Sequence, residues 1–380
     1  MSDPMRIFAG SRVHLLWQLL LIALIGMGLH AYAIQYERGL AVSGMSDQIS
    51  WGLYIANFTF LVGLAASAVV LVLPAMLGQS ALARLIPLGE AMAIAAVTMS
   101  LLFVTADLGQ PLRVWHALPL LGTPNFPASI LAWDVFIITA YLLLNLGLFY
   151  RFFRHPAHPT PRLALLTAIL LGIGIHTVTA FMLAGLPARS FWHSAALAPR
   201  FIASAFASGS AVLLAVLFLL EKTMGRPLHR EAMPLLSGIL AVSLWMDLFL
   251  LGSELFVRFY PLASHGHFAV APTPWAAMAV EGLAALVMTV PGLRRRPVWL
   301  LGACLAAFGA VMIEKGLGLV VTGFQPTPLG EHVDYAPTWV EIHVSLGIWG
   351  FGLLLFTWLV RMALAAWDRF SQPFATKDSP

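Results

Sequence analysis

The 380-residue sequence has little charge and a single cysteine. Only 10 % of its residues are Asp, Glu, Lys or Arg, whereas 60 % are hydrophobic. The lone Cys304 excludes an intramolecular disulfide, a zinc–thiolate site and an iron–sulfur cluster held by this chain. The sequence also lacks a nucleophile elbow, a P-loop and a dinucleotide-binding glycine motif. The chemistry of soluble enzymes is therefore not indicated.

Long apolar runs are abundant, and the mean hydropathy is +0.86. Each run approaches the roughly 20 residues that a helix needs to cross a bilayer. The sequence therefore predicts an all-α integral membrane protein with about ten transmembrane helices, at 14–34, 52–77, 87–106, 129–150, 163–185, 198–221, 233–257, 273–291, 298–322 and 340–363. Although Ala31-Tyr32-Ala33 could be mistaken for a signal-peptide cleavage site, the first run is long enough to span and we expect it to be retained.

The basic residues are distributed unevenly over the predicted loops. With a cytoplasmic N-terminus, 15 of the 21 Lys and Arg residues lie inside and Lys315 lies within a span. The five outside are Arg38, Arg113, Arg189, Arg200 and Arg258. The positive-inside rule predicts a multi-pass protein of a bacterial inner (cytoplasmic) membrane with both termini in the cytoplasm. This topology explains the sequence pI of about 9.5 without a nucleic-acid partner.

Histidines in the spans are too few and too poorly placed for a haem. Only His14, His30, His176 and His343 lie in or at the edge of a span. A transmembrane haem takes two axial ligands at one depth, but His14 and His30 are about 24 Å apart along one helix. His30 and His343 could meet near the outer face, although each is more simply an interfacial histidine. The histidines of the loops lack metal-binding spacing.

Carboxylates on apolar helices are costly, which makes them candidates for function. Two pairs of acids have the same separation in the sequence. Asp107 and Asp134 are 27 residues apart across one predicted outer loop, and Glu254 and Glu281 are 27 residues apart across a later one. The repeat indicates one architecture used twice.

Three further polar residues have structural explanations. Glu90 lies at the cytoplasmic edge of its span, where the helix dipole favours an acid in the first turn. Glu341 and His343 open the last span, where capping or interfacial solvation accounts for them.

Glu314 and Lys315 are adjacent within the ninth span and point about 100° apart, so they cannot form a simple pair. We expect Lys315 to compensate an acid on a neighbouring helix, such as Glu281 or Asp247. Structural and proton-relay roles for this pair remain equally open.

Polar side chains in the fourth and fifth spans can form one site. Tyr141 follows Asp134 by seven residues, which places it on the same helical face and about 10 Å deeper. His176 lies near the middle of the next span. A hydroxyl, a carboxylate and an imidazole suit a quinone, whose carbonyls need donors and whose two-electron reduction needs two protons. An ion-coupled transporter fits these residues nearly as well.

Several segments resemble one known family. Ser50–Ala66 resembles the second helix of the NrfD/polysulfide reductase membrane-subunit family, as do Asp107–Pro111, Trp133-Asp134, Ala188–His193 and Ala198–Phe201. Ala336–Glu341 is similar to the start of the last helix in the ten-span branch, which includes the hydrogenase subunit HybB. The segments cover most of the chain. The likeness is greatest to the DsrP branch, whose members belong to DsrMKJOP sulfur-metabolism complexes.

The resemblance implies two four-helix bundles, formed by spans two to five and six to nine, flanked by the first and last helices. It divides the chain into an N-terminal helix with a periplasmic loop (1–51), a first bundle with the quinone site (52–185), a second bundle (186–322), and the last helix with a cytoplasmic tail (323–380).

The resemblance also implies a pocket for menaquinone or ubiquinone near the outer face of the first bundle. At matching positions, Asp134 and His176 would handle the quinone protons, and Asp107 would link the pocket to the outer surface. Asn57 and Tyr141 would orient the ring, with Trp133 as a wall against it. In the second bundle, the residues that resemble positions proposed to conduct or store protons are Asp247, Glu254, Glu281 and Lys315.

The implied function is electron exchange between the membrane quinone pool and a periplasmic, DsrO-like iron–sulfur protein with four clusters. A haem b protein of the membrane and a multihaem cytochrome c are further expected partners, while this chain itself would hold neither haem nor iron–sulfur cluster. Three alternatives remain: a proton or ion channel or carrier without redox chemistry, a HybB-like hydrogenase anchor, and a purely structural anchor.

Overall fold

The computed structural model describes residues 11–65, 67–118, 121–156, 158, 160–189, 191–224, 231–260, 272–325, 327, 330–331 and 333–371. Ala66 and Ser190, which belong to two of the family-like segments, lie outside these residues. Within the described part of the chain, regular structure is entirely helical, and nine helices are long and apolar enough to cross a membrane. A tenth, Trp275–Thr289, is apolar but shorter. The predicted all-α membrane fold is confirmed.

The helices that match single predicted spans are α2 (Arg12–Arg38), α6 (Ile86–Asp107), α7 (Ile130–Arg154), α8 (Arg162–Ala184), α9 (Leu197–Met224), α10 (Ala232–Phe259), α11 (Pro272–Thr289), α13 (Pro297–Lys315) and α15 (Trp339–Ser371). Most of their limits agree with the prediction to within a few residues, but α13 ends at Lys315 rather than at 322, and α15 extends to Ser371 rather than to 363. The second span is formed by α3 (Leu53–Ala65) and α4 (Ser67–Met76). Short helices lie between them: η1 (Gly39–Val42), α5 (Ser80–Ala83), η2 (Pro111–Ala117), α12 (Pro291–Arg294), α14 (Leu317–Val320) and η3 (Thr322–Phe324).

Local sequence explains several helix ends. Ser11 and Ser129 precede α2 and α7, and each hydroxyl accepts a hydrogen bond from a backbone N–H of the first turn. Pro297 opens α13, where its fixed φ suits the first helical position. The helix α2 ends at Gly39, whose φ of 72° lies in the left-handed region. Apolar runs therefore become helices whose limits are set by serine, proline and glycine.

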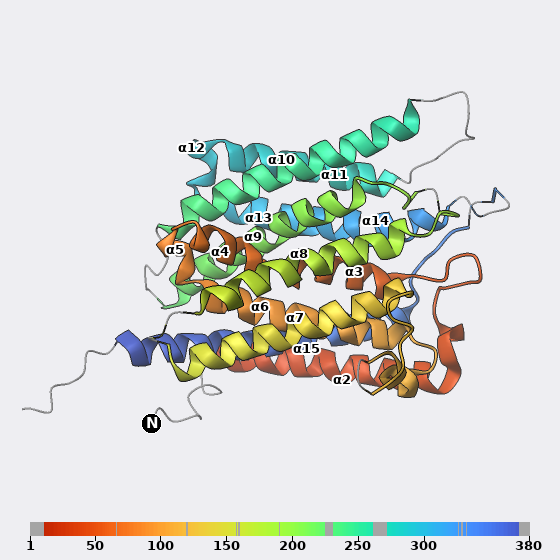
Figure 1. Cartoon of the computed structure of the whole chain (residues 1–380), viewed down its shortest axis with the longest axis horizontal. Helices are drawn as coiled ribbons and strands as arrows, with labels where there is room; N and C mark the ends of the chain where they lie inside the picture. Colours follow the sequence, from red (N-terminus) through yellow and green to blue (C-terminus); the bar gives the residue numbers. More distant parts are fainter. Residues whose placement is uncertain are drawn as a thin grey trace, which may run out of the picture.

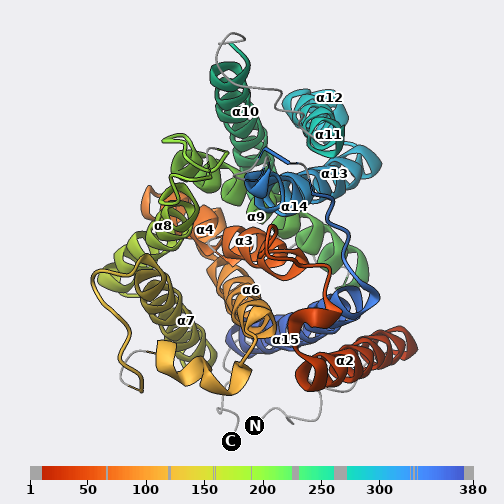
Figure 2. The ribbon, with the colours of Figure 1, turned by 90° about the vertical axis from the view of Figure 1, so that its right-hand side faces the viewer.

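The long helices lie side by side, and the described chain starts and ends at the same end of the molecule, next to α5 and α12 (Figure 1). The opposite end, where α2 and α6 finish and α3 begins, is called the outer end below, following the orientation that the charges predict. Seen end-on, α10, α11 and α13 gather on one side, α7 and α8 on another, and α2 with α15 on a third (Figure 2).

Three helices lie at the centre of this arrangement. Nearly every described residue of α3 is buried, and so are most residues of α6. In contrast, α2 exposes Val13, Leu15 and Leu16, as a lipid-facing helix would. The helix α9 packs against α3, α4 and α8 as well as against α10 and α13. It therefore joins the first half of the chain to the second. The division into two bundles of four stays a prediction.

The first and last helices meet where both carry glycine. A Cβ atom on Gly28 of α2 would lie 2.5 Å from the Cα of Gly347 on α15, and one on Gly350 would lie 3.0 Å from the Cβ of Leu24. Small residues let the two backbones approach closely. Between helices in lipid there is no hydrophobic driving force, so the van der Waals contacts of this close packing stabilise the pair instead. The contact attaches the exposed α2 to the rest of the protein.

Glu341 fastens the outer loops to the start of α15. Its Oε2 accepts from the backbone N–H groups of Gly44, at 2.7 Å, and Thr338, at 2.9 Å, while its Oε1 accepts from the Tyr335 hydroxyl at 2.7 Å. The Tyr335 oxygen in turn accepts from the N–H of Leu53 at 2.7 Å, which fixes the start of α3. Burial, together with Glu341, raises the pKa of Tyr335, so its hydroxyl stays protonated and continues to donate. The capping role predicted for Glu341 is confirmed.

The glycine contact gives a first prediction. Gly28→Val places a branched side chain against the backbone of α15 and is expected to lower the free energy of unfolding by about 1–3 kcal/mol, the usual effect of overpacking. Gly26→Val, two residues away and facing open space, is the matched control. Thermal unfolding in detergent measures both, and equal stability of the two variants would contradict the assignment.

Candidate functional site

A buried carboxyl–hydroxyl pair joins α7 to α8 near the outer end. Asp134, 3 % exposed, lies in the second turn of α7, and the Thr179 hydroxyl donates to its Oδ1 at 2.6 Å. The same hydroxyl lies 2.8 Å from the carbonyl of Ile175, so its single proton can serve only one of these acceptors at a time. The buried Asp134 carboxyl thus has one hydrogen-bond donor, and it shares that donor with a backbone carbonyl.

His176 lies one helical turn deeper than Thr179 on the same face of α8. Its side chain is 1 % exposed, and neither ring nitrogen has a hydrogen-bond partner among the described residues. An unsatisfied buried polar group costs about 1–3 kcal/mol, so such groups are rare unless another molecule satisfies them. The imidazole is therefore a candidate for binding a ligand, three residues before the threonine that contacts Asp134.

Tyr141 shares the buried face of Asp134 but is directed away from it. Its side chain is fully buried, and its hydroxyl donates to the carbonyl of Ala65 on α3 at 3.1 Å. Asn145, one turn further along α7, donates to the backbone carbonyl of Tyr141 at 2.8 Å. Tyr141 thus lines the same interior, with its hydroxyl engaged at the end of α3.

Asn57 and Trp133 are not brought to the Asp134–Thr179 pair. The Asn57 side chain faces α15, where its Oδ1 accepts from Trp349 Nε1 at 2.8 Å. Trp133 is 38 % exposed and donates from Nε1 to the carbonyl of Pro127 at 2.9 Å. Its ring packs against Phe126, with the ring centroids 4.4 Å apart. Their predicted roles in orienting and enclosing a ring stay predictions.

Asp107 occupies a separate polar region at the outer end. It is the last residue of α6, and its Oδ1 has no hydrogen-bond partner among the described residues. The preceding carbonyl, of Ala106, accepts from Gln35 Nε2 at 2.6 Å, and Gln35 accepts from the Tyr54 hydroxyl at 2.6 Å. A cavity of about 190 Å³ beside it is lined by residues that include Gln35 and Gln110. This cavity lies next to the Asp107–Pro111 segment.

Glu90 does not have the structural role expected from the sequence. Because α6 begins at Ile86, Glu90 lies in the second helical turn, beyond the reach of a first-turn effect of the helix dipole. Its side chain is 2 % exposed, and its Oε2 has no hydrogen-bond partner in the described part of the chain. Glu90 interacts electrostatically with Tyr141 of α7. The dipole explanation is wrong, and Glu90 is a buried acid of the interior.

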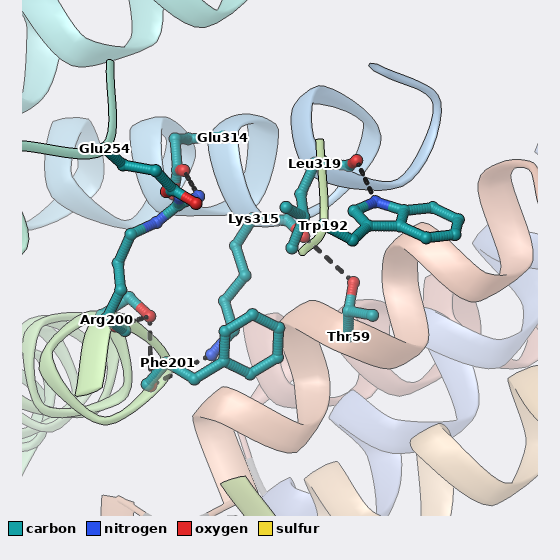
Figure 3. Close-up of polar contacts among 9 residues, drawn as sticks. Thr59, Trp192, Arg200, Phe201, Glu254, Glu314, Lys315 and Leu319 are labelled. Atoms are coloured by element: carbon teal, nitrogen blue, oxygen red, sulfur yellow. Dashed lines mark hydrogen bonds and ion pairs between the residues drawn. The ribbon is translucent and has the colours of Figure 1, made fainter. Parts of the chain in front are cut away.

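A second cluster lies between α9, α10 and α13, centred on Arg200. This side chain is 3 % exposed, and its two terminal nitrogens form separate ion pairs with Glu254 and Glu314 (Figure 3). The charge count assigns Arg200 to the outside, although the predicted span 198–221 already includes it, and the structure places it in the first turn of α9. Charge counting cannot distinguish an arginine just outside a span from one turned inward. The available signal was the pair of acids, at positions 254 and 314, that needed a cation.

Lys315 lies next to Glu314 and points the other way (Figure 3). Its ammonium donates to the carbonyl of Phe201 at 3.2 Å and lies 4.1 Å from the centroid of the Phe201 ring, in a cation–π contact. Of the two acids expected to compensate it, Asp247 interacts with it electrostatically.

Asp247 and Glu281 form a carboxyl pair between α10 and α11. Both are buried, at 1 % and 0 % exposure, and neither has a donor from another described residue. None of their four carboxyl oxygens has a hydrogen-bond partner among the described residues, and the two groups interact electrostatically. Two ionised carboxyls that interact in a buried position repel each other, so a proton on one of them lowers the cost of burying the pair. The pair is therefore a candidate for holding one proton.

The two carboxylate pairs with matched spacing have different surroundings. Asp134 meets a hydroxyl, whereas Asp107 faces the polar region at the outer end. Glu254 meets an arginine, and Glu281 meets another acid. In the described part of the chain, no group of three His, Cys, Asp or Glu side chains is arranged to hold a metal ion.

Together these features define a membrane-embedded subunit with two polar interiors, one at α7 and α8 and the other between α9, α10, α11 and α13. Residues 41–325 match the family model described as "Polysulphide reductase, NrfD". The chain belongs to the NrfD polysulphide reductase family, whose expected resemblance is thereby confirmed.

Relatives with assigned names are membrane subunits of reductase complexes. A provisionally named dimethyl sulfoxide reductase membrane subunit from Halobacterium salinarum is 28 % identical, over 89 % of this chain and 88 % of its own. A menaquinone reductase integral membrane subunit from Nitratidesulfovibrio vulgaris is 24 % identical, over 90 % and 89 %. An Hdr-like menaquinol oxidoreductase integral membrane subunit from Archaeoglobus fulgidus is 25 % identical, over 53 % and 49 %.

The Arg200 ion pairs give a second prediction. Arg200→Met leaves two buried carboxylates without their cation and is expected to lower the free energy of unfolding by about 3–5 kcal/mol. Adding Glu254→Gln and Glu314→Gln removes the uncompensated charges and should restore most of the loss. Arg113→Met, at an exposed position, is the control. Thermal unfolding in nanodiscs measures all three variants, and a stable Arg200→Met protein would contradict the structural role.

Proposed function

We propose that this chain is the quinone-reactive membrane subunit of a reductase complex, exchanging electrons between the menaquinone pool and an iron–sulfur partner protein. The observation that carries the proposal is His176, which is buried one helical turn from the Asp134–Thr179 pair and whose two ring nitrogens have no partner in the part of the chain that the structure describes. The names of two relatives, which include menaquinone and menaquinol, favour menaquinone over ubiquinone.

The residues present fit a quinone headgroup. When bound, the quinone supplies a carrier of two electrons and two protons. A neutral imidazole can donate from one ring nitrogen to a ring carbonyl, and His176 has no competing protein acceptor among the described residues. Asp134 can hold a proton for the second carbonyl, with Thr179 donating whenever the carboxyl is ionised. The two side chains would thus bind the ring and exchange its protons.

Asp107 supports an exit for protons at the outer end. Its carboxyl has an unpaired oxygen, and the next four residues line the cavity of about 190 Å³. A cavity of that size holds several waters when its walls are polar. We infer that protons pass from the quinone site through Asp107 to this cavity. In this proposal the outer end faces away from the cytoplasm, and both termini lie on the cytoplasmic side of an inner membrane.

The partners proposed are those of a Dsr-type complex. An iron–sulfur protein with four clusters would dock at the outer end, because the proposed quinone site lies near it and this chain supplies no cysteine pair for a cluster. A haem b protein of the membrane and a multihaem cytochrome c would complete the assembly. A HybB-like hydrogenase anchor would use the same fold with another electron source.

The quinone site gives a third prediction. In the purified complex, Asp134→Asn and His176→Ala are each expected to lower the rate of quinol-dependent reduction of the partner clusters by about 100-fold, the usual contribution of a positioned proton-transfer group. His155→Ala, at an exposed position on the cytoplasmic side, should leave the rate unchanged.

Two outcomes would decide against the assignment. Turnover by both variants at the wild-type rate would place the quinone elsewhere in the protein. A wild-type complex that retains no menaquinone and shows no quinol-dependent reduction would remove the redox function and leave the alternative of a structural anchor.

A proton relay in the second cluster is the second function proposed, and the Asp247–Glu281 pair favours it. A proton on one of two buried carboxyls that interact electrostatically can take the place of a compensating cation, and such a pair can accept and pass on protons. Glu254 and Lys315 flank this pair, the first held by Arg200 and the second under the influence of Asp247. The relay would couple quinone chemistry to proton movement across the membrane.

A fourth prediction concerns this relay. Glu281→Gln keeps a hydrogen-bonding group but removes the acidic proton, and it is expected to abolish proton uptake in liposomes while leaving at least half of the quinol turnover. Glu37→Gln, an exposed acid on α2, is the control. Undiminished proton uptake by the Glu281 variant would remove the second cluster from the mechanism.

A further inference from the structure

The outer end of the molecule, which faces the viewer in Figure 2, carries a pocket walled by aromatic rings. The pocket has a volume of about 310 Å³, and three separate parts of the chain line it. Trp51 comes from the residues just before α3, Arg189 and Trp192 from the connection between α8 and α9, and Phe324 from the end of η3. The described lining shares no residue with the proposed quinone site, so the pocket needs an explanation of its own.

The rings of this pocket are held in fixed positions. Trp192 is fully buried, and its Nε1 donates to the carbonyl of Leu319 at 2.9 Å (Figure 3). A Cβ atom at position 323 would collide with the indole, so Gly323 provides the space for this ring. Trp51 stacks on Trp192 with the ring centroids 5.5 Å apart, and Phe324 meets Trp192 edge-on at 5.0 Å. Side chains that are already ordered lose little conformational entropy when another molecule binds to them.

Arg189 is the charged residue of the described lining. Its guanidinium carbon lies 4.6 Å from the centroid of the Phe324 ring, and its Nη1 donates to the Phe324 carbonyl at 3.3 Å. These two contacts are the interactions that the guanidinium makes with other described residues. A guanidinium has five N–H donors, so most of them remain available to a ligand. The pocket therefore presents an oriented cation, uncompensated by any described acid, beside aromatic rings.

The chemistry of this pocket favours a carboxylate carried by a protein. The planar fork of a guanidinium matches a carboxylate, which it can bind through two parallel hydrogen bonds. A single ion pair open to solvent contributes only about 0–1 kcal/mol, so Arg189 by itself would hold a free small anion weakly. A protein loop can add apolar contacts with Trp51 and with Leu186, which is 39 % exposed. Trp and Arg are also the residue types that most often dominate the affinity of protein interfaces.

The pocket lies directly beyond the outer end of the helix that carries His176. Helix α8 ends at Ala184, eight residues after His176 and two before Leu186 of the pocket. At 1.5 Å per residue, His176 lies about 12 Å along the helix from its outer end. A protein bound at the pocket would thus be held close to the proposed quinone site, as electron exchange requires.

We propose that this pocket is the docking site of the iron–sulfur partner protein. Arg189 pairs with a carboxylate on an exposed loop of the partner, and an apolar side chain beside that carboxylate packs against Trp51 and Trp192. The inference rests on the proposed function, which calls for an iron–sulfur partner at the outer end. It adds the place where the partner docks and the chemistry by which this chain recognises it.

The fifth prediction places a photo-crosslinker in the pocket. With p-benzoylphenylalanine in place of Ala188, an exposed lining residue, the complex purified from native membranes is expected to form a cross-link to the iron–sulfur protein, within a peptide that contains Asp or Glu. The same group in place of Leu112, which is exposed on η2, is the control and should not label that peptide. Cross-links from position 188 to lipid, to a second copy of this chain, or to a peptide without an acid would overturn the proposal.

Reversal of the charge tests the role of the guanidinium. Arg189→Glu is expected to lower the amount of iron–sulfur protein that co-purifies with this chain by at least about tenfold, as on loss of a residue that dominates an interface. Arg113→Glu, an exposed arginine of η2, is the matched control and should retain the partner. Arg189→Gln should cause a smaller loss in the same direction, and it decides the matter if Arg189→Glu does not insert into the membrane.

The outcomes separate the docking site from the quinone function. Full retention of the partner by both Arg189 variants, with normal quinol turnover, overturns the docking site and leaves the quinone function standing. Loss of the partner together with a lower unfolding temperature of this chain indicates a packing role for Arg189 and also overturns the docking site. If the wild-type complex holds the partner but shows no quinol-dependent reduction, the quinone function fails, while loss of the partner in Arg189→Glu still supports the docking site.

Discussion

Burial of charge between apolar helices is the constraint on which the rest of this structure depends. In a low-dielectric interior, a carboxylate or ammonium must find a counter-charge, a hydrogen-bond donor or a proton within the protein. Arg200 meets this requirement with Glu254 and Glu314, and it ties α9, α10 and α13 together. Asp247 and Glu281 have no hydrogen-bond partner among the described residues and interact electrostatically with each other, so a proton on one of them would meet the requirement. The Arg200 ion pairs and these two acids define the second polar interior.

The first polar interior meets the same requirement only in part. Thr179 gives Asp134 one donor, while His176 has none among the described residues. Buried polar groups that lack hydrogen-bond partners are suited to binding a polar ring from the membrane and to exchanging protons with it. Lys315 lies where helix α13 ends, and its ammonium occupies the space left by Gly63 on α3.

The number, length and limits of the helices could be predicted because apolar run length, proline and glycine are local properties of the sequence. The family could be predicted from short segments such as Asp107–Pro111. The rotation of each helix about its axis and the contacts of its side chains could not be predicted, because an apolar run does not show which neighbouring helix each of its faces contacts. Asn57 therefore faces Trp349, Arg200 is buried in an ion-pair cluster although it was counted as an outside charge, and Glu90 is a buried acid. Each of these depends on contacts between residues far apart in the chain.

The central claim is that a quinone binds between α7 and α8, next to Asp134 and His176. Photolabelling of the intact complex with an azido-menaquinone, followed by mapping of the labelled peptides, tests it most directly. The account predicts that labels fall on peptides from α7 and α8 and disappear when unlabelled menaquinone is added in excess. Labels confined to α10, α11 and α13, or labels that excess menaquinone does not displace, would contradict it.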